Sequence, residues 1–178
     1  MVTKKFYIAD SHFSHTNIIS HCRRPYRDAE VMDEDMIQRW NAVVRESDIV
    51  YHLGDFSFEL GNADRVRDIF ARLHGRKFLV IGNHDVRKDG SLHPTVAALG
   101  WAAPPVHALE VKDEGRRVYL SHYAHRVWPG QHHGSYHFYG HSHGALPGCG
   151  RSRDVGVDCP DVGFTPRTFA ELTKDMEA

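Results

Sequence analysis

The chain has 178 residues and nearly balanced charges, with 22 Lys and Arg against 23 Asp and Glu and a formal net charge of -1. This length fits one compact domain and can bury one core, so we expect a single domain over residues 1–178. The charge balance excludes the strongly basic footprint of a dedicated nucleic-acid binder, and no apolar run is long enough to span a membrane.

The three cysteines, Cys22, Cys149 and Cys159, are odd in number and show no C-x-x-C spacing. This pattern argues against a disulfide framework and against a cysteine-based zinc site. The first residues contain no long apolar segment and no small-residue cleavage site, so we expect no secretory signal. A reducing cytoplasm is therefore the expected compartment.

The first half of the chain alternates short apolar runs with segments of helical periodicity. Apolar runs that end abruptly in polar residues predict strands at residues 5–9, 48–53 and 77–81. Apolar residues at helical spacing predict the helices between and after them, at residues 28–44, 62–73 and 92–99. The alternation of strand and helix is a βαβ pattern, which is typical of α/β folds.

The second half is richer in predicted strands. Residues 106–111 and 116–120 are expected to form a hairpin around Asp113-Glu114-Gly115. Further strands are expected at residues 135–139 and 155–157, and a closing helix at residues 167–176 that begins near Thr165-Pro166. No repeat, linker or low-complexity tract divides the pattern, which favours one α/β domain.

Histidine is over-represented, with 15 residues against 9 Phe and 7 Tyr. Histidine is the commonest metal ligand among side chains and a common acid or base. Some of these residues are expected to lie on the surface without a role, such as His132 and His133 in a glycine-flanked loop. Their positions, rather than their number, therefore decide which histidines are functional.

Five predicted strands are each followed at once by side chains that can bind metal. These clusters are Asp10-x-His12, Gly54-Asp55, Gly82-Asn83-His84-Asp85, Ser121-His122 and Gly140-His141-x-His143. Sites in open α/β sheets form beyond the carboxyl ends of the strands, so we expect the five clusters to meet at one rim. The glycines permit sharp turns and a close approach of the backbone to a ligand.

The side chains in these clusters suit a pair of divalent cations. Such a site needs oxygen and imidazole ligands, a carboxylate that can bridge, and open positions for water and substrate. Two cations roughly 3.5–4 Å apart can clamp a phosphoryl oxygen during in-line displacement. The expected ligands, which include no thiolate, are Asp10, His12, Asp55, Asn83, His122, His141 and His143.

In this order and spacing, the clusters resemble those of the calcineurin-like metallophosphoesterases, a family with two metals. The pattern of that family runs D-x-H, G-D, G-N-H-D or -E, a lone H and G-H-x-H, and every part of it is present between residues 10 and 143. Residues 11–19, 50–56 and 154–158 also resemble a compact subgroup found in bacteria and phages.

The resemblance implies that residues 1–178 form one metallophosphoesterase domain with a four-layer α/β/β/α sandwich and with the metals at the edge of the sheets. It also implies the ligand sets. The first metal would be held by Asp10, His12 and His143, the second by Asn83, His122 and His141, and Asp55 would bridge the two.

The same resemblance implies the catalytic roles. His84 would lie beside the substrate, as the general acid that protonates the leaving oxygen or as a donor to the phosphoryl group. Asp85 would fix the tautomer and orientation of His84, as carboxylates do for catalytic imidazoles. A metal-bridging hydroxide would attack phosphorus in a phosphodiester or phosphomonoester bond.

The resemblance favours Mn for the two cations, although mixed imidazole and carboxylate ligands also suit Fe, Zn, Co or Ni. We expect a small phosphoester substrate and no membrane partner, and the oligomeric state stays open. Two alternatives also stay open. The near-neutral charge counts against a nuclease of the same fold, unless Arg23, Arg24, Arg27, Arg151 and Arg153 form one basic patch. The complete ligand set counts against a non-catalytic metal-binding scaffold.

Residues close to the motifs have more than one interpretation. His15 and Asn17 either line the substrate pocket or pack at the start of a helix, and His125 and Arg126 either face the substrate or lie outside the site. His52 is expected to be a buried, hydrogen-bonded core histidine.

Three further features are also ambiguous. The cluster of Arg23, Arg24 and Arg27 suits either a phosphate contact or a solvated face. Asp154 and Asp158 either support the ligands through hydrogen bonds or serve packing, and Trp128 either anchors a loop or offers a face to a base.

Overall fold

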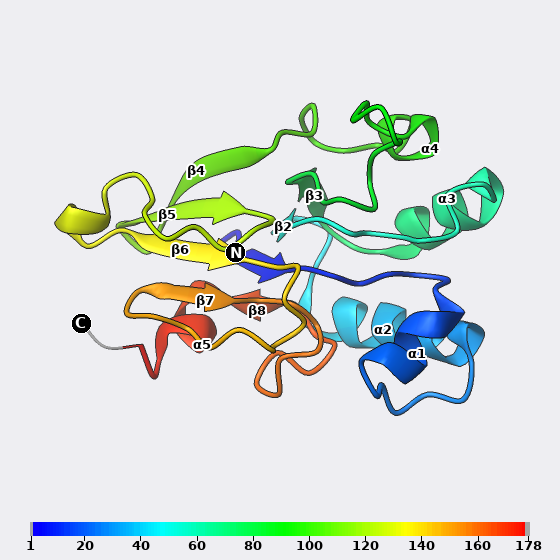
Figure 1. The fold of residues 1–178 in the computed structure, drawn as a ribbon, viewed down its shortest axis with the longest axis horizontal. Coiled ribbons are helices and arrows are strands. Elements are labelled where there is room, and N and C mark those ends of the chain that lie inside the picture. The colour runs from blue at the N-terminus through cyan, green and yellow to red at the C-terminus, as the bar shows by residue number, and fades with distance from the viewer. Residues whose placement is uncertain (1, 177–178) are drawn as a thin grey trace.

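The computed structural model describes residues 2–176, which form two four-stranded sheets packed against each other (Figure 1). The first sheet has the order β3-β2-β1-β8 and the second has the order β4-β5-β6-β7. The strands of the first sheet are β1 (Lys5–Ile8), β2 (Ile49–His52), β3 (Arg76–Leu79) and β8 (Arg167–Thr168). Those of the second are β4 (Ala108–Asp113), β5 (Arg116–Ser121), β6 (Tyr136–Tyr139) and β7 (Ser152–Asp154).

Parallel pairing brings the ends of the central strands to one edge of the sandwich. The strands β1, β2 and β3 run parallel, and so do β5, β6 and β7. Only the outer pairs, β1 with β8 and β4 with β5, are antiparallel. The loops that follow β1, β2, β3, β5 and β6 are the five loops that carry the metal-capable clusters.

Helices cover the outer face of the first sheet. They are α1 (Thr16–His21), α2 (Ala29–Val43), α3 (Ala63–Arg72) and α4 (Pro94–Ala97), which gather on the side away from the second sheet in Figure 1. The side chains of Asp28 and Asn62 accept hydrogen bonds from the first turns of α2 and α3, as N-caps do. Apolar residues of these two helices, such as Trp40 and Ile69, form one core with Phe6 of β1.

A second core lies between the two sheets. Successive side chains of a strand point to opposite faces, so Phe6 and Ile8 enter the helix-covered core while Tyr7 enters the core between the sheets. Tyr7 meets Phe138 of β6 edge-on, with ring centroids 5.0 Å apart. The short helix α5 (Phe169–Thr173) adds Phe169 to this core. Burial on both faces of β1 explains its continuous apolar run.

The outer face of the second sheet is covered by the segment 123–135, which contains the 3₁₀ helix η1 (Gln131–His133). His137 of β6 is fully buried beneath it and stacks on Trp128, with ring centroids 5.3 Å apart. The imidazole lies between two hydroxyls, with Nε2 2.8 Å from Ser121 Oγ and Nδ1 2.8 Å from Ser152 Oγ. The α/β sandwich expected from the resemblance is confirmed, with a loop and one helical turn as its outermost layer here.

Three of the predicted elements differ from the structure. The strand expected at residues 155–157 lies just before them, as β7. Residues 155–157 themselves contribute only an isolated bridge between Gly156 and Ala9. The closing helix begins at Phe169 rather than near residue 167, since Thr168 and Glu171 form a capping box there. The helix expected at 92–99 is limited to α4, and α1 was not predicted as an element.

No helix among residues 2–176 has both the length and the apolar character that a membrane crossing requires.

Burial lowers the pKa of His137 from 6.5 to about 3. Below pH 6.5 the unfolded chain gains a proton at this residue and the native protein does not, so His137 lowers stability as the pH falls from 6.5 toward 3. Asn cannot titrate in this range. As the pH falls from about 6 to about 4, the free energy of unfolding should decrease less in the His137→Asn variant than in the unmodified protein. The difference should be about 1.4 kcal/mol per pH unit.

Urea unfolding of the metal-free protein at several pH values measures this slope. His132→Asn is the matched control, because His132 is exposed in η1. Equal slopes for His137→Asn and the unmodified protein would contradict the expected burial of a neutral imidazole.

Candidate metal centre

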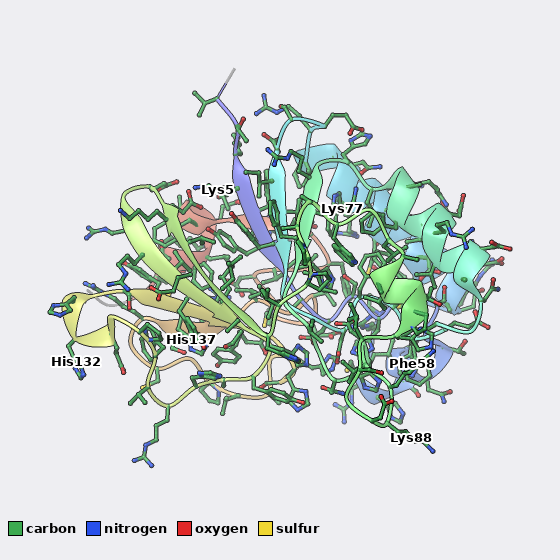
Figure 2. The ribbon with its side chains drawn as sticks, turned by 90° about the horizontal axis from the view of Figure 1, so that it is seen from above. Lys5, Phe58, Lys77, Lys88, His132 and His137 are labelled. Atoms are coloured by element: carbon green, nitrogen blue, oxygen red, sulfur yellow. The ribbon has the colours of Figure 1, made fainter. Side chains whose placement is uncertain are left out.

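All five metal-capable clusters lie at the carboxyl-terminal edge of the two sheets. In Figure 2, Lys5 and Lys77 mark the ends at which β1 and β3 begin, and Phe58 lies beyond the opposite ends. The loops after β1 and β2 continue the pairing of their strands, because the Asp10 N–H donates to Gly54 O at 3.0 Å and the His12 N–H to Asp55 O at 3.0 Å. Extended pairing therefore carries the parallel register of the strands into the site.

The structure brings the expected ligands together in two groups. Ligand atoms within 4.8 Å of one another form one group of Asp10, His12 and His143 and another of Asp55, His122 and His141. The Asp55 Oδ2 atom lies 3.5 Å from His12 Nε2 and 3.5 Å from His122 Nε2, so this carboxylate faces both groups.

Asn83 joins the second group through its side-chain oxygen. Its Oδ1 lies 3.0 Å from His122 Nε2, which places an amide oxygen and an imidazole nitrogen side by side. All seven predicted ligands thus lie in one cluster, and no residue of the predicted set lies elsewhere. The geometry has the two-group form that a pair of cations requires, with one carboxylate between the groups.

Buried nitrogens without partners show that these residues fit metal ions. Both ring nitrogens of His12 are buried and have no hydrogen-bond partner among the described residues. A buried polar atom without a partner costs about 1–3 kcal/mol, so native proteins rarely leave both nitrogens of one imidazole in this state. A cation bound beside His12 Nε2 and the carboxylate of Asp10 would give one of these two nitrogens a partner.

Strained backbone is concentrated at the same residues. Five of the seven predicted ligands have positive φ angles: Asp10 (58°), His12 (49°), Asp55 (57°), His141 (68°) and His143 (48°). Residues other than glycine adopt this conformation at a cost, and such strain collects at active sites and ligand clamps. The loops are therefore shaped for the position of these side chains rather than for the lowest backbone energy.

Burial shifts the titration of the site toward neutral groups. Burial, together with the charges of Asp55 and Asp154, raises the pKa of Asp10 well above its ordinary value, and burial also raises the pKa of Asp55. Burial lowers the pKa of His122 to about 4 and that of His12 further. The imidazoles of His12 and His122 are thus neutral near pH 7, as metal coordination requires, and divalent cations would favour the ionised carboxylates.

A hydrogen bond to a carboxylate supports the predicted ligand His143. Its Nδ1 lies 2.7 Å from Asp158 Oδ2, and Asp158 accepts two hydrogen bonds of 2.8 Å from the guanidinium of Arg24. Although burial alone would raise it, the hydrogen bonds from His143 and Arg24 hold the pKa of Asp158 below its usual range. Arg24 also donates to the backbone oxygens of Asp10 and Ser11.

These contacts decide two interpretations that the sequence left open. Arg24 is 4% exposed and its donors are used by the protein, so it braces the first motif and does not contact a phosphate. Asp158 supports a predicted ligand through a hydrogen bond. Asp154 holds the loops on either side, because it accepts from the N–H groups of Gly144 and Gly156.

The role expected for Asp85 needs correction. Its carboxylate accepts hydrogen bonds from the N–H groups of Asp55, Phe56 and Gly82 at 2.8–3.1 Å, and none of these comes from the His84 ring. Burial and the charge of Asp55 raise the pKa of Asp85 to about 6. Asp85 therefore fixes the loop that carries Asp55 and does not orient the imidazole of His84.

His84 lies beside the cluster and is partly exposed. Its ring centroid is 5.1 Å from that of His12, and its N–H donates to Asp55 Oδ1 at 2.8 Å. A ring nitrogen of His84 also lies within 4.8 Å of ligand atoms of His12 and Asp55. The backbone bond to Asp55 couples the position of His84 to the carboxylate between the two groups.

Other histidines lie outside the ligand cluster. His52 is buried and its Nε2 lies 2.9 Å from Ser11 Oγ, which confirms the predicted core histidine. His125 packs on Tyr119 and His137 on the outer face of the second sheet. Trp128 stacks on His137 and is therefore a loop anchor, not a face for a base at the metal cluster.

Two exposed aromatic residues beside the cluster were not recognised from the sequence. Phe58 is 45% exposed and stacks on His15, while Tyr123 is 49% exposed and contacts the rings of His122 and His141. The available signal was their position, three residues after Asp55 and one after His122. Sequence patterns alone do not distinguish such residues from core aromatics.

Comparison with known proteins gives the fold more support than the activity. No family model matches the chain. An uncharacterised protein from Methanocaldococcus jannaschii is 43% identical over 86 residues, which make up 48% of this chain and 49% of that protein. The match thus spans about half the length of this curated relative.

Among solved structures, a protein of unknown function from Aquifex aeolicus has a TM-score of 0.73 at 23% identity, covering 97% of this chain and 99% of that one. This likeness confirms the fold. A novel archaeal phosphodiesterase is similar over 86% of this chain and 82% of its own length, with a TM-score of 0.49 and 18% identity.

A side chain at Gly82 should disrupt the centre without altering the core. A Cβ atom there would fall closer than 3.0 Å to Asp55 Oδ1, Asp55 N and His122 Cε1, so the Asp55 carboxylate would have to move. The Gly82→Ala variant should bind about 10- to 100-fold more weakly to divalent cations, as expected when ligand positioning is lost. Gly61→Ala is the control, because no atom lies within 4 Å of its added Cβ.

Calorimetric titration of both variants with Mn²⁺, beside the unmodified protein, measures the difference. Unchanged Mn²⁺ affinity in Gly82→Ala would show that Asp55 and His122 are not ligands.

Removing the charge behind His143 should weaken the first ligand group. Asp158→Asn replaces the acceptor for His143 Nδ1 and one partner of the buried Arg24, so we expect about a 10- to 100-fold loss of metal affinity. Asp161→Asn removes a surface ion pair with Arg153 and should leave affinity within about twofold. Metal content after dialysis, measured by mass spectrometry, compares the two. Equal metal retention in both variants would argue against this support of His143.

Proposed function

We propose that this chain is a metal-dependent phosphoesterase that hydrolyses phosphodiester or phosphomonoester bonds at the Asp55 cluster. The observation that carries the proposal is the carboxylate of Asp55, which lies 3.5 Å from the nearest imidazole nitrogen of each ligand group. The order of the motifs, which resembles that of calcineurin-like metallophosphoesterases, supports the same conclusion.

The ligand sets support two divalent cations, one held by Asp10, His12 and His143 and one by Asn83, His122 and His141, with Asp55 between them. When bound, the cations would lower the pKa of a water molecule and neutralise charge on the phosphoryl oxygens. Imidazole and carboxylate ligands suit Mn, which we favour, and also Fe, Zn, Co or Ni.

The chain's own residues would orient the substrate and handle the proton. His84 is partly exposed and adjoins His12 and Asp55, so its ring can reach the oxygen that leaves phosphorus. As a general acid it would donate a proton to this oxygen, and the backbone bond from His84 to Asp55 would keep the imidazole beside the reacting centre. The buried walls around Asp10 and His12 would exclude bulk water.

The charges on the protein favour a small phosphoester over a nucleic acid. Three of the arginines considered for a basic patch have acidic partners. Arg24 forms a buried pair with Asp158, Arg27 forms a surface pair with Asp28, and Arg153 pairs with Asp161. Binding to a nucleic-acid backbone normally needs several free cations on one surface. We expect no membrane partner, and the three free cysteines fit a reducing compartment such as the cytoplasm.

A phosphoester panel tests the proposal directly. Protein reconstituted with Mn²⁺ is assayed with bis-p-nitrophenyl phosphate, p-nitrophenyl phosphate and single-stranded DNA at several salt concentrations, and bound metal is counted. Hydrolysis of the small esters with little salt dependence supports the proposal. Cleavage of DNA that falls steeply with salt favours the nuclease, and bound metal without any hydrolysis favours the scaffold.

Removing the imidazole of His84 should separate catalysis from metal binding. His84→Ala should lower kcat by about 10²- to 10⁴-fold for an alkyl phosphoester and leave the metal content unchanged. The loss should be smaller for p-nitrophenyl esters, because p-nitrophenolate leaves without a proton. Steady-state kinetics on both esters measure this, with His132→Ala as the control in an exposed loop. An equal loss for both leaving groups would remove the acid role, and lost metal would make His84 a ligand.

A further inference from the structure

Phe58 presents an open aromatic face at the edge of the candidate centre. One face of its ring stacks on the imidazole of His15, with ring centroids 3.6 Å apart and an angle of 4° between the planes. Phe58 is nevertheless 45% exposed, so the contact with His15 leaves a large part of the residue open to solvent. An exposed phenyl ring costs free energy in water, and the structure holds this one in place.

Backbone hydrogen bonds fix the position of Phe58 in its loop. The Phe58 N–H donates to Phe13 O at 3.0 Å, and Ser57 Oγ donates to the same oxygen at 3.0 Å. Phe13 and Ser57 also form a parallel bridge, which extends the pairing of the loops after β1 and β2. The ring is therefore positioned by the same loops that position Asp10, His12 and Asp55, and it is set before any ligand arrives.

Phe58 lies on the side of the site that contains His84. Its ring centroid is 5.4 Å from that of His84, and His84 in turn is 5.1 Å from His12. Phe58 thus adjoins the imidazole assigned to the leaving oxygen. The other exposed aromatic, Tyr123, lies beside His141 and Asn83 of the second group, with its ring 4.6 Å from that of His141.

The surroundings favour a small planar ligand rather than a protein surface. The neighbours of Phe58 in the sequence are the buried Ser57 and the exposed, charged Glu59, so no apolar run extends from the ring. A protein interface would bury a contiguous patch with several apolar anchors. A single rigid ring backed by an imidazole instead matches the way proteins stack one base or one aryl group.

We propose that Phe58, backed by His15, is a stacking platform for a planar aromatic ring on the leaving alcohol. Preferred substrates are then phosphoesters of nucleosides or of arylmethyl alcohols, and Phe58 determines this specificity without contacting phosphorus. The proposal rests on the proposed function, because it takes the side of His84 as the side of the leaving group. No bond is made or broken at Phe58, so its contribution is binding energy alone.

Matched substrate pairs isolate the stacked ring from the chemistry. A nucleoside 5′-phosphate and methyl riboside 5-phosphate have the same kind of leaving group, a primary alkoxide. Benzyl phosphate and cyclohexylmethyl phosphate form a second pair with primary alkoxide leaving groups. Within each pair only one member carries an aromatic ring. Each is assayed as the monoester and as the methyl diester with Mn²⁺-reconstituted protein.

The variants keep the volume of the side chain or keep the ring. Phe58→Leu removes the π face, and should lower kcat/KM for the aromatic member of a pair by roughly 5- to 150-fold while changing the other member little. Phe58→Tyr keeps the ring and should retain the preference. Val31→Ala, an exposed apolar residue on α2, should change neither rate. If Phe58→Leu loses the preference for the aromatic member in only the nucleoside pair or only the benzyl pair, the result supports the platform and identifies its ligand.

A binding measurement keeps this proposal separate from the proposed function. Saturation-transfer NMR of adenosine, beside methyl riboside, should show transfer to the base protons with the unmodified protein and lose it with Phe58→Leu. If the unmodified protein is active and Phe58→Leu lowers kcat/KM equally for both members of a pair, or for neither, the platform is overturned. The proposed phosphoesterase activity is then unaffected. Protein without any phosphoesterase activity overturns the proposed function, and the NMR comparison then decides whether Phe58 stacks a base.

Discussion

The burial of the Asp55 carboxylate is the constraint on which the rest of the site depends. Asp55 is 1% exposed and lies between two groups of imidazoles, in surroundings that disfavour its charge. Two neighbouring carboxyl groups, Asp10 and Asp85, are also buried. Three buried acids so close together are costly unless positive charge is added. The divalent cations proposed above would supply this positive charge.

The backbone around Asp55 meets this constraint with hydrogen bonds rather than with cationic side chains. Asp85 accepts from the N–H groups of Asp55, Phe56 and Gly82, and Asp55 itself accepts from the N–H of His84. No Lys or Arg of the described residues forms an ion pair with Asp55. The hydrogen bonds therefore hold the loop in place, and no cationic side chain of the described residues neutralises the Asp55 carboxylate.

The two ligand groups are supported differently, and this difference bears on how each binds metal. His143 has a carboxylate, Asp158, behind its Nδ1, and a buried guanidinium behind that carboxylate. His122 instead has the backbone oxygen of Leu53 at 2.7 Å from its Nδ1. A carboxylate partner raises the basicity of an imidazole more than a neutral carbonyl does. The first group should thus be the stronger donor. Its carboxylate, Asp158, depends in turn on an ion pair with Arg24, which follows α1 in the chain.

The sequence was most informative where local pattern and chemistry coincide. Asp10, His12 and the other five predicted ligands directly follow strands, and parallel pairing alone brings strand ends to one edge. The roles of Asp85, Arg24 and Phe58 depend on contacts between loops that are distant in sequence, such as the 2.8 Å bond from Arg24 to Asp158 across 134 residues. The valines of residues 155–157 predicted a strand. In the structure these residues belong to a loop that packs under the site, where Gly156 lies close to Asp10.

The packing of the two sheets sets the geometry within each ligand group. Asp10, His12, Asp55 and Asn83 follow strands of the first sheet, whereas His122, His141 and His143 follow strands of the second. Each ligand group combines residues of both sheets, so neither group is complete within one sheet. The core between the sheets, with Tyr7 against Phe138, therefore controls the ligand geometry, while the helix-covered core of Trp40 mainly controls stability. A cavity between the sheets would alter the distances between the ligands of each group, because close-packed cores transmit such strain. The metal centre is in this sense a property of the interface between the two sheets.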